Sequence, residues 1–289
     1  LIMKRLLIAN RAEIACRVIR TAHEMGIETV AVYSDVDASA LHVQQASTSY
    51  ALGGNTPAES YLHIEKIIQA ALATRSDAIH PGYGFLSENP DFAQAVIDAG
   101  LIWVGPSPAS IRLLGNKAAA KRLAQQAGVP CLPGYDGLDE YGLVSEYSQS
   151  NAVMQEHADK IGYPLMVKAM NGGGGRGMRK VDKSADLLSA LESARQEAKN
   201  AFNDSSVLLE RALLAPRHIE VQIFGDQHGQ VVHLGERDCS VQRRHQKIIE
   251  ESPSPVLDAA LREQICLSAV NLAKAAQYYG AGTVEFLLE

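Results

Sequence analysis

Apolar residues in the first third of the chain follow two alternating spacings. Short continuous apolar runs, typical of buried strands, are followed by stretches with an apolar residue every three or four positions, as on one helix face. Repeated strand–helix units of this kind predict a parallel sheet with helices on both faces. We expect strands at residues 5–9, 29–33, 77–80 and 101–104, and helices at 13–25, 63–73 and 92–99.

A loop rich in glycine and proline, HPGYGFLSEN at residues 80–89, follows one of these strands. Ligands of open α/β sheets usually bind at the carboxyl ends of strands, so the loop is a candidate binding element. A structural turn is the alternative, and the loop alone does not separate the two. No GxGxxG motif follows the first strand, so no dinucleotide is assigned to it.

A second domain begins after Gly105 and Pro106 and a short connecting helix at 108–114. Its first helix opens at Asn116, a favourable N-cap residue. Lys117 then lies in the first turn, where the helix dipole disfavours a cation unless the lysine faces a bound anion or bends into water. We expect a first domain at residues 1–115 and a second at 116–289.

A glycine tract at residues 172–177 separates two apolar strands, predicted at 164–170 and 178–181. Backbone N–H groups without side chains over them can wrap an anion, so the tract is typical of a phosphate-covering lid. Lys168 lies inside the apolar first strand, where a solvated lysine is not expected. The tract matches neither the GxxxxGK[ST] loop nor the GxGxxG turn. The alternative is a flexible linker with a lysine that reaches solvent.

The residues on either side of the tract are less distinctive. Residues 134–162 are polar and acidic, and we expect a surface excursion with one helix near 152–161. A helix at 185–202 and a strand running into a connector at 207–214 follow the tract.

A polar strand is predicted at residues 218–224. Its alternating pattern places His218, Glu220 and Gln222 on one face. A half-exposed strand with solvated polar residues is the simplest interpretation of this segment by itself.

Residues 236–251 carry a dense run of cations. If the run is extended, Arg243, His245 and Lys247 share one face, and they repel one another unless an anion or carboxylates compensate them. The acidic residues at 250–251 are candidates for that compensation. A salt-bridged surface is the alternative to an anion site.

The last predicted strand, at residues 283–289, holds a glutamate between apolar neighbours. Glu285 is expected on a central strand, where its carboxylate needs a partner, commonly Mg²⁺ shared with phosphate oxygens. An outward-facing Glu285 is equally compatible with the strand alone. The lysines and the glycine tract favour the metal site.

Composition narrows the class of protein. With 289 residues, 46% of them hydrophobic, the chain can bury a core in about two domains. A net charge of −6 implies no general affinity for nucleic acid or membrane surfaces, and no apolar run is long enough for a membrane span. Four cysteines without a CxxC pair suit reduced thiols. Leu1 and Ile2 precede Met3, which we take as the natural start without a signal peptide, so we expect a soluble intracellular protein.

In combination, these motifs resemble a biotin carboxylase of the ATP-grasp superfamily, most closely the biotin-containing α subunits of methylcrotonoyl-CoA, geranyl-CoA or propionyl-CoA carboxylases. The resemblance covers essentially the whole chain. No single motif is specific, but the set is. It consists of residues 8–15, 80–89, Lys168 with 172–178, 236–247 and 282–286.

The resemblance implies an α/β protein with a Rossmann-like N-terminal domain and an incomplete ATP-grasp fold, whose glycine-rich lid at about 135–207 closes over ATP. It implies catalytic roles for Lys247, which would hold bicarbonate, and for His245 and Gln242 beside the phosphates. It implies that Glu285 binds Mg²⁺ or Mn²⁺. The implied ATP contacts are Lys117, Lys168, Gly173, Gly174, Gly175, Gly177, Met178, Glu210, Arg211, Ala212, Leu213, His218, Gln242 and His245.

The implied reaction is attack of bicarbonate on the γ-phosphate of ATP to give carboxyphosphate, followed by carboxylation of biotin at N1. The implied partners are a biotinyl carrier domain and a carboxyltransferase β subunit, with a homo-oligomer also compatible, in the bacterial cytoplasm or the mitochondrial matrix. Another carboxyphosphate-forming ligase, similar to carbamoyl-phosphate synthetase, is one alternative. A catalytically incomplete fragment that binds nucleotide and serves assembly is the other.

The chain departs from the family pattern at two places. Ala12 stands where the family nearly always has glycine, so the first strand-to-helix turn is strained if this position has a positive φ. The chain stops at Glu289, before the strand that in the family supplies a second metal carboxylate, an asparagine and an arginine. We therefore expect poor turnover or none from this chain alone.

Overall fold

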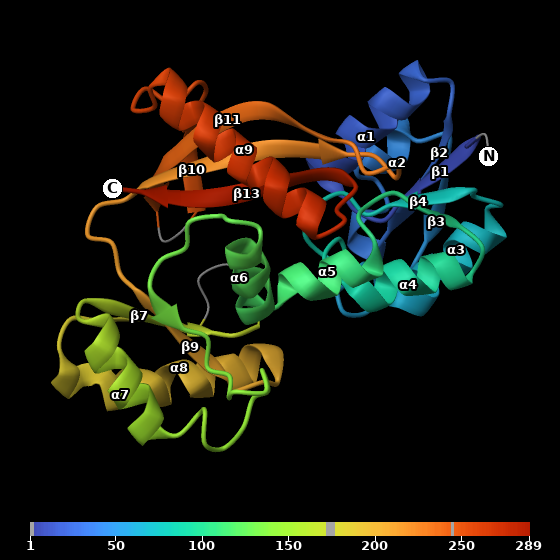
Figure 1. The fold of residues 1–289 in the computed structure, drawn as a ribbon. Helices are drawn as coiled ribbons and strands as arrows, with labels where there is room; N and C mark the ends of the chain where they lie inside the picture. Colours follow the sequence, from blue (N-terminus) through green and yellow to red (C-terminus); the bar gives the residue numbers. More distant parts are fainter. Residues whose placement is uncertain (1–2, 172–176, 244–245) are drawn as a thin grey trace. The chain divides into compact units, whose positions relative to one another are not determined.

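The computed structural model describes residues 3–171, 177–243 and 246–289 (Figure 1). The chain divides into two compact units, Leu1–Arg112 and Leu113–Glu289. The helix α5 (Pro108–Gly115) spans the boundary between them.

The first unit is a five-stranded parallel sheet in the order β3-β2-β1-β4-β5. Leu7 of β1 packs with the α3 and α4 side of the core, whereas Leu6 and Ile8 pack with α1, because successive side chains of a strand point to opposite faces. The elements are β1 (Arg5–Ile8), α1 (Ala12–Glu24), β2 (Glu28–Tyr33), the 3₁₀ turn η1 (Asp35–Asp37), α2 (Leu41–Gln45), β3 (Thr48–Ala51), α3 (Ile64–Ala73), β4 (Ala78–His80), α4 (Pro90–Asp98) and β5 (Ile102–Trp103).

The predicted parallel sheet with helices on both faces is confirmed for this unit. The sequence pattern missed β3 and α2. β3 is an edge strand whose residues are exposed or half-buried, so it lacks the apolar run by which the other strands were found.

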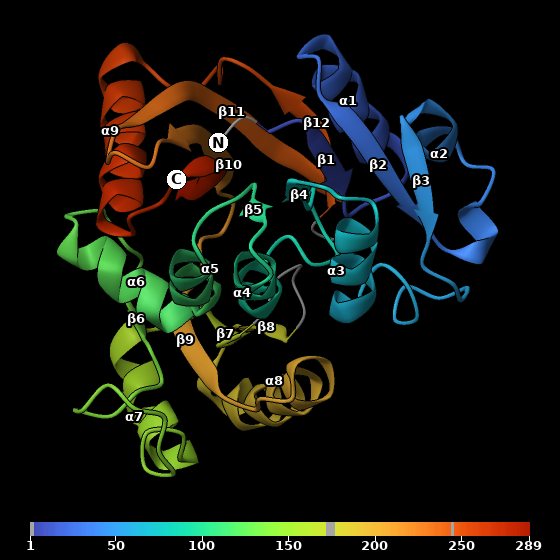
Figure 2. The same ribbon diagram turned by 90° about the vertical axis from the view of Figure 1, so that its right-hand side faces the viewer.

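The second unit contains two four-stranded sheets, which we call the lysine sheet (β6-β9-β7-β8) and the glutamate sheet (β12-β11-β10-β13). Apolar residues on one face of the lysine sheet pack against α7 and α8, and α9 lies against the glutamate sheet (Figures 1 and 2). The elements are α6 (Lys117–Gln126), β6 (Gly134–Tyr135), α7 (Asn151–Ile161), β7 (Leu165–Ala169), β8 (Met178–Val181), η2 (Ser184–Asp186), α8 (Leu187–Phe202), β9 (Val207–Arg211), β10 (Arg217–Gly225), β11 (Val231–Arg243), β12 (Gln246–Glu251), α9 (Ala259–Ala275) and β13 (Gly280–Leu288).

Two local expectations for the glutamate sheet were wrong. The cationic run is not one extended face, because β11 and β12 pair antiparallel with Arg243 opposite Gln246, so the chain reverses between them. In the described structure β13 is an edge strand rather than a central one, since it pairs only with β10 in the sheet order. Its residues alternate between half-buried and exposed because successive side chains of a strand point to opposite faces, and Val284, Phe286 and Leu288 pack against the core that includes α9.

Candidate functional site

Lys168, Lys121 and Glu210 form a half-enclosed ion-pair cluster, here called the lysine cluster. Lys168 on β7 and Glu210 on β9 occupy the sheet face opposite the apolar residues that pack on α7 and α8. The Lys168 Nζ lies 2.5 Å from Glu210 Oε1 and the Lys121 Nζ lies 3.2 Å from Glu210 Oε2. The three side chains are 16–18% exposed.

The electrostatics of this cluster favour a charged Glu210. Burial opposes ionisation of Glu210, but Lys168 and Lys121 outweigh it and hold the pKa of Glu210 below its ordinary value. Two ammonium groups share one carboxylate, which leaves a net positive charge. Such a cluster attracts an anion.

The first turn of α6 brings Lys117 toward the same cluster. The Asn116 side chain caps the helix by accepting from the Ala119 N–H at 2.9 Å, as expected from the sequence. The Lys117 N–H donates to the Met170 carbonyl at 3.2 Å, which ties the helix start to the end of β7. Burial and the nearby Lys168 lower the pKa of Lys117. A cation destabilised in this way gains from a bound anion.

The connector after Glu210 is held by backbone hydrogen bonds. The N–H groups of Arg211 and Ala212 donate to Pro133 and Pro164 at 2.9 and 3.0 Å. These N–H groups are therefore not free for a ligand. Leu213 follows them and is half-buried.

The described end of the glycine tract is Gly177, which precedes Met178 opposite Lys168. Gly177 has φ +67°, and a Cβ there would lie 2.7 Å from Ala169 Cβ. Both the backbone angle and the close approach therefore require glycine. The predicted contacts Gly173, Gly174 and Gly175 lie outside the described residues.

A second cluster, here called the carboxylate cluster, lies on the glutamate sheet. Glu220 is buried, with a side chain 4% exposed, and contacts both Arg237 and Lys247. Lys247 also contacts Glu285 Oε1 at 2.7 Å. The pKa of Glu220 is low because these cations outweigh burial, and the two carboxylates hold the pKa of Lys247 above its ordinary range.

His218 and Gln242 are brought together beside this cluster. The Gln242 amide Nε2 lies 2.6 Å from His218 Nδ1 and donates to the Cys239 carbonyl at 2.8 Å. An amide nitrogen only donates, so Nδ1 accepts and a neutral His218 carries its proton on Nε2. That nitrogen lies 3.5 Å from Glu285 Oε2. His245 lies outside the described residues.

Family models account for almost all of the sequence. Residues 2–111 match the biotin carboxylase N-terminal domain, and residues 116–289 match the ATP binding domain of the carbamoyl-phosphate synthase L chain. The chain belongs to the biotin carboxylase family. The mitochondrial methylcrotonoyl-CoA carboxylase subunit alpha of Rattus norvegicus is 52% identical over 285 residues, which are 99% of this chain and 39% of that protein.

Solved biotin carboxylases have the same fold. A beta-gamma-ATP complex of biotin carboxylase from Campylobacter jejuni is 46% identical with a TM-score of 0.94, covering 100% of this chain and 63% of that one. The biotin carboxylase domain of Hydrogenobacter thermophilus 2-oxoglutarate carboxylase, solved with MgADP, ADP and bicarbonate, is 44% identical with a TM-score of 0.91, covering 99% of this chain and 61% of that one. The chain therefore spans less than two thirds of these relatives. No helix in the described residues has the length and apolar character for a membrane crossing.

Some of the described residues predicted for a biotin carboxylase site, among them Lys168, Lys247 and Glu285, belong to these two clusters. In the described ranges, the contacts of Lys168 remain in the lysine cluster, whereas Lys247 and Glu285 meet in the carboxylate cluster. The expectation that the acidic residues at 250–251 compensate the cationic run is met only in part. Glu250 lies 3.6 Å from Arg237, whereas Lys247 is compensated by Glu220 and Glu285.

Sequence reasoning missed three residues of the clusters. Glu220 was interpreted as part of a solvated face, and Arg237 received no role although it lies in a family motif. Lys121 is one turn after Lys117, and this i,i+4 spacing is the signal that could have placed both on one helix face.

Glu285 fits a biotin carboxylase metal site as a single oxygen donor. Its side chain is 51% exposed and offers carboxylate oxygens, which Mg²⁺ prefers, together with phosphate oxygens and water. A second group of donors, Glu220, Cys239 and Glu250, has ligand atoms within 4.8 Å of one another. Burial raises the pKa of Cys239 to about 11. Both oxygens of Glu220 are buried against cations, whereas Glu285 is half exposed, so this second group does not suit a metal.

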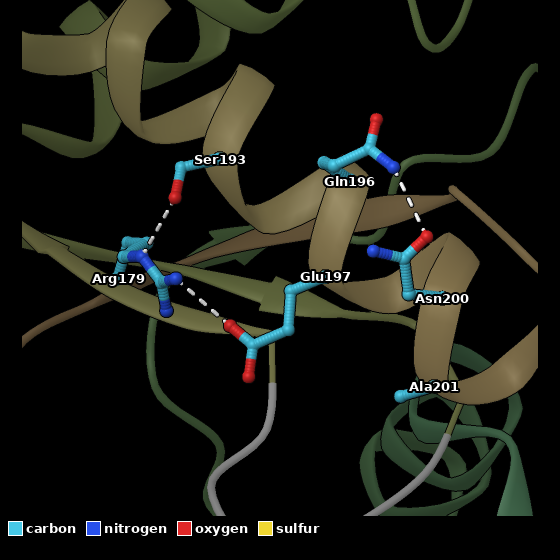
Figure 3. A pocket seen from close by; sticks show the side chains of 6 residues that line it. All are labelled: Arg179, Ser193, Gln196, Glu197, Asn200 and Ala201. Carbon is cyan, nitrogen blue, oxygen red and sulfur yellow. Dashed lines mark hydrogen bonds and ion pairs between the residues drawn. The ribbon is translucent and has the colours of Figure 1, made fainter.

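A cavity of about 550 Å³ lies between β8 and α8 (Figure 3). Its polar side chains contact one another. Arg179 lies 2.8 Å from Glu197 and 3.1 Å from Ser193, and Gln196 donates to Asn200 at 3.0 Å. The described residues that line the cavity therefore carry no excess charge with which to select a ligand.

Proposed function

We propose that this chain is the biotin carboxylase part of an acyl-CoA carboxylase α subunit, and that it carboxylates biotin with bicarbonate while ATP is converted to ADP and phosphate. The observation that carries the proposal is its likeness, over the whole chain, to a biotin carboxylase solved as a beta-gamma-ATP complex. The cationic clusters support it, because a reaction between anions needs positive charge placed in advance.

The lysine cluster is the proposed nucleotide site. Lys117 and Lys168 contact the phosphates, covered by Gly173, Gly174, Gly175, Gly177 and Met178. The segment from Glu210 to Leu213 meets the adenine, and His218 meets the ribose or its polar surroundings. On this proposal residues 1–115 are the N-terminal domain and 116–289 the ATP-grasp domain, with a lid subdomain at about 135–207.

The carboxylate cluster is the proposed bicarbonate site. An ammonium group has three N–H donors, and those of Lys247 supply Glu220 and Glu285, which leaves one for a bicarbonate oxygen. Gln242 and His245 line the site beside it. Glu285 holds Mg²⁺ or Mn²⁺, and the bound cation would neutralise charge on the phosphates.

The proposed reaction has two transfers. A bicarbonate oxygen bonds to the γ-phosphorus as the bond to the β–γ bridging oxygen breaks, which gives carboxyphosphate and ADP. The carboxyl carbon then bonds to biotin N1 as its bond to the phosphate oxygen breaks, and the released phosphate takes the N1 proton. The biotin is carried by a separate carrier domain, the product is used by a carboxyltransferase subunit, and the compartment is the bacterial cytoplasm or the mitochondrial matrix.

A second candidate is a ligase similar to carbamoyl-phosphate synthetase. One observation favours it, the match of residues 116–289 to the ATP binding domain of the carbamoyl-phosphate synthase L chain. That enzyme class also forms carboxyphosphate, but it transfers the carboxyl group to ammonia rather than to biotin.

The test is ATP hydrolysis by the purified chain with bicarbonate, in parallel reactions with biotin, ammonia or glutamine. Hydrolysis that requires bicarbonate and rises with biotin supports the biotin carboxylase. Dependence on ammonia or glutamine supports the second candidate. ATP binding without turnover under every condition supports a nucleotide-binding fragment that serves assembly, and absence of ATP binding overturns the nucleotide site.

A further inference from the structure

The Lys121 side chain on α6 reaches Glu210 on β9. Its Nζ lies 3.2 Å from Glu210 Oε2, and its side chain is only 16% exposed. A Cβ on Gly134 would lie 2.4 Å from the backbone oxygen of Leu209 and 2.8 Å from this Nζ. The Leu209 backbone therefore requires glycine at this position, and the absence of a side chain also leaves room for the ammonium group beside Glu210.

The two oxygens of Glu210 are divided between two lysines. Oε1 takes Lys168 at 2.5 Å, and Oε2 takes Lys121. If Lys168 were the sole partner, the pair would be neutral, and Glu210 would compete with any anion for that ammonium group. With Lys121 present the three groups carry a net charge of +1, and attraction between charges is strong where water is largely excluded.

We propose that Lys121 is a positioning residue for ATP: it holds Glu210 from the α6 side, so that Lys168 remains available to the nucleotide phosphates. This inference rests on the proposed function, because it assumes that the lysine cluster binds ATP. Lys121 was not among the predicted site residues, and on this inference it contributes to the affinity for the ATP phosphates.

Replacing Lys121 with methionine tests the idea. The change keeps an apolar chain of similar length and removes the charge, so Glu210 is left to Lys168 alone. ATP affinity falls by about 10- to 100-fold, as for loss of a hydrogen bond to a charged group. Adenosine has no phosphate, so its affinity falls much less than that of ATP, although Glu210 is also part of the segment proposed to meet the adenine.

Two further variants separate positioning from folding. Lys121→Arg keeps the charge and the contact with Glu210 and retains ATP affinity within about threefold. Lys160→Met is the matched control, because Lys160 pairs with Glu156 on the exposed surface of α7 and stands 65% exposed. It leaves ATP affinity unchanged.

The measurement is titration calorimetry of ATP, ADP and adenosine, with the midpoint of thermal unfolding recorded for each variant. Equal ATP affinity in Lys121→Met and unchanged protein overturns the inference while the proposed function stands. Equal losses of ATP and adenosine also overturn it, because they indicate a general disturbance of the cluster. If the methionine variant does not fold, Lys121→Gln takes its place, because glutamine keeps a hydrogen bond without the charge. The same results for ATP and adenosine then support or overturn the inference. An unchanged protein that binds no ATP refutes the proposed function and the inference together.

Discussion

Glu220 and Glu285 lie directly opposite each other on the adjacent antiparallel strands β10 and β13. Like charges in this position destabilise a sheet. Lys247 contacts both carboxylates from β12, so one ammonium group removes the repulsion between them. The lysine proposed to hold bicarbonate therefore also stabilises the strands that form its site.

Substitution of Lys247 by alanine is expected to slow biotin carboxylation by about 10²–10³-fold, because it removes a cation placed in advance for the reacting anion. The measurement is the rate of biotin-dependent ATP hydrolysis at saturating bicarbonate, in a full-length biotin carboxylase that contains this sequence. Lys274→Ala is the control, since Lys274 is an exposed lysine in the last turn of α9. An unchanged rate in Lys247→Ala would remove Lys247 from the site.

The contact between Glu220 and Lys247 is also expected to contribute to the free energy of unfolding. In a double-mutant cycle of Glu220→Gln and Lys247→Met, the two changes are coupled by about 0.5–3 kcal/mol, as for members of one ion-pair network. Urea unfolding of the two single variants and the double variant measures the coupling. Additive losses would show that the contact contributes nothing to stability.

The first unit is expected to lose stability in acid through Asp37. This buried carboxylate accepts from Arg11 and Tyr61 at 2.6 Å. Its hydrogen bonds with Arg11, opposed by burial and aided by Tyr61, lower the pKa of Asp37 to about 2. Because the folded pKa is below the unfolded value of about 3.9, the contribution is complete above pH 5 and is lost as the pH falls toward 2.

The size of this contribution is about 2.5 kcal/mol, from a pKa difference of nearly two units. Denaturant unfolding between pH 6 and about pH 2, for the unchanged protein and Asp37→Asn, isolates it from the other carboxylates. The difference in free energy of unfolding between the two proteins should shrink as the pH falls through this range. A difference independent of pH would contradict the assignment.

Replacing Ala12 with glycine is expected to stabilise the protein. Ala12 is exposed and has φ +56°, which confirms the strain anticipated from the missing family glycine. An alanine there costs about 1–2 kcal/mol, whereas glycine adopts the angle freely but loses more entropy on folding. Ala12→Gly should therefore raise the free energy of unfolding by about 0.5–1 kcal/mol.

The matched control for this change is Ala95→Gly in α4 of the same unit. Ala95 lies inside a regular helix, so glycine there should lower the free energy of unfolding by about 1 kcal/mol. If both substitutions destabilise the protein equally, the angle at Ala12 carries no strain.

Alanine at Gly177 and at Gly229 should have unequal effects. Both glycines have positive φ, +67° and +88°, so alanine is strained at either position. Only at Gly177 would the added Cβ also lie 2.7 Å from the Cβ of Ala169. The added overlap should make Gly177→Ala the more destabilising by about 1–3 kcal/mol. Thermal or urea unfolding compares the two variants, and equal losses would mean that Ala169 moves aside without cost.

Local features of the site were predictable because they depend on near neighbours in sequence. The cap at Asn116, the alternation around His218 and the strain at Ala12 each follow from residue type and spacing. The course of the cationic run was not predictable in this way. Antiparallel pairing of β11 with β12 replaces the extended face, because this pairing satisfies backbone groups that one long strand would leave without a partner.

The sequence by itself determined the α/β fold, the family and the residue types of both clusters, because periodicity and motifs are encoded over short stretches. Only the tertiary structure decided which charges meet. Lys247 and Glu285 are 38 residues apart in the chain, and Lys121 and Glu210 are 89 apart. Their contacts arise from strand register and from the position of α6 against β9. For Lys121 and Glu210, burial then makes each charge dependent on its partner.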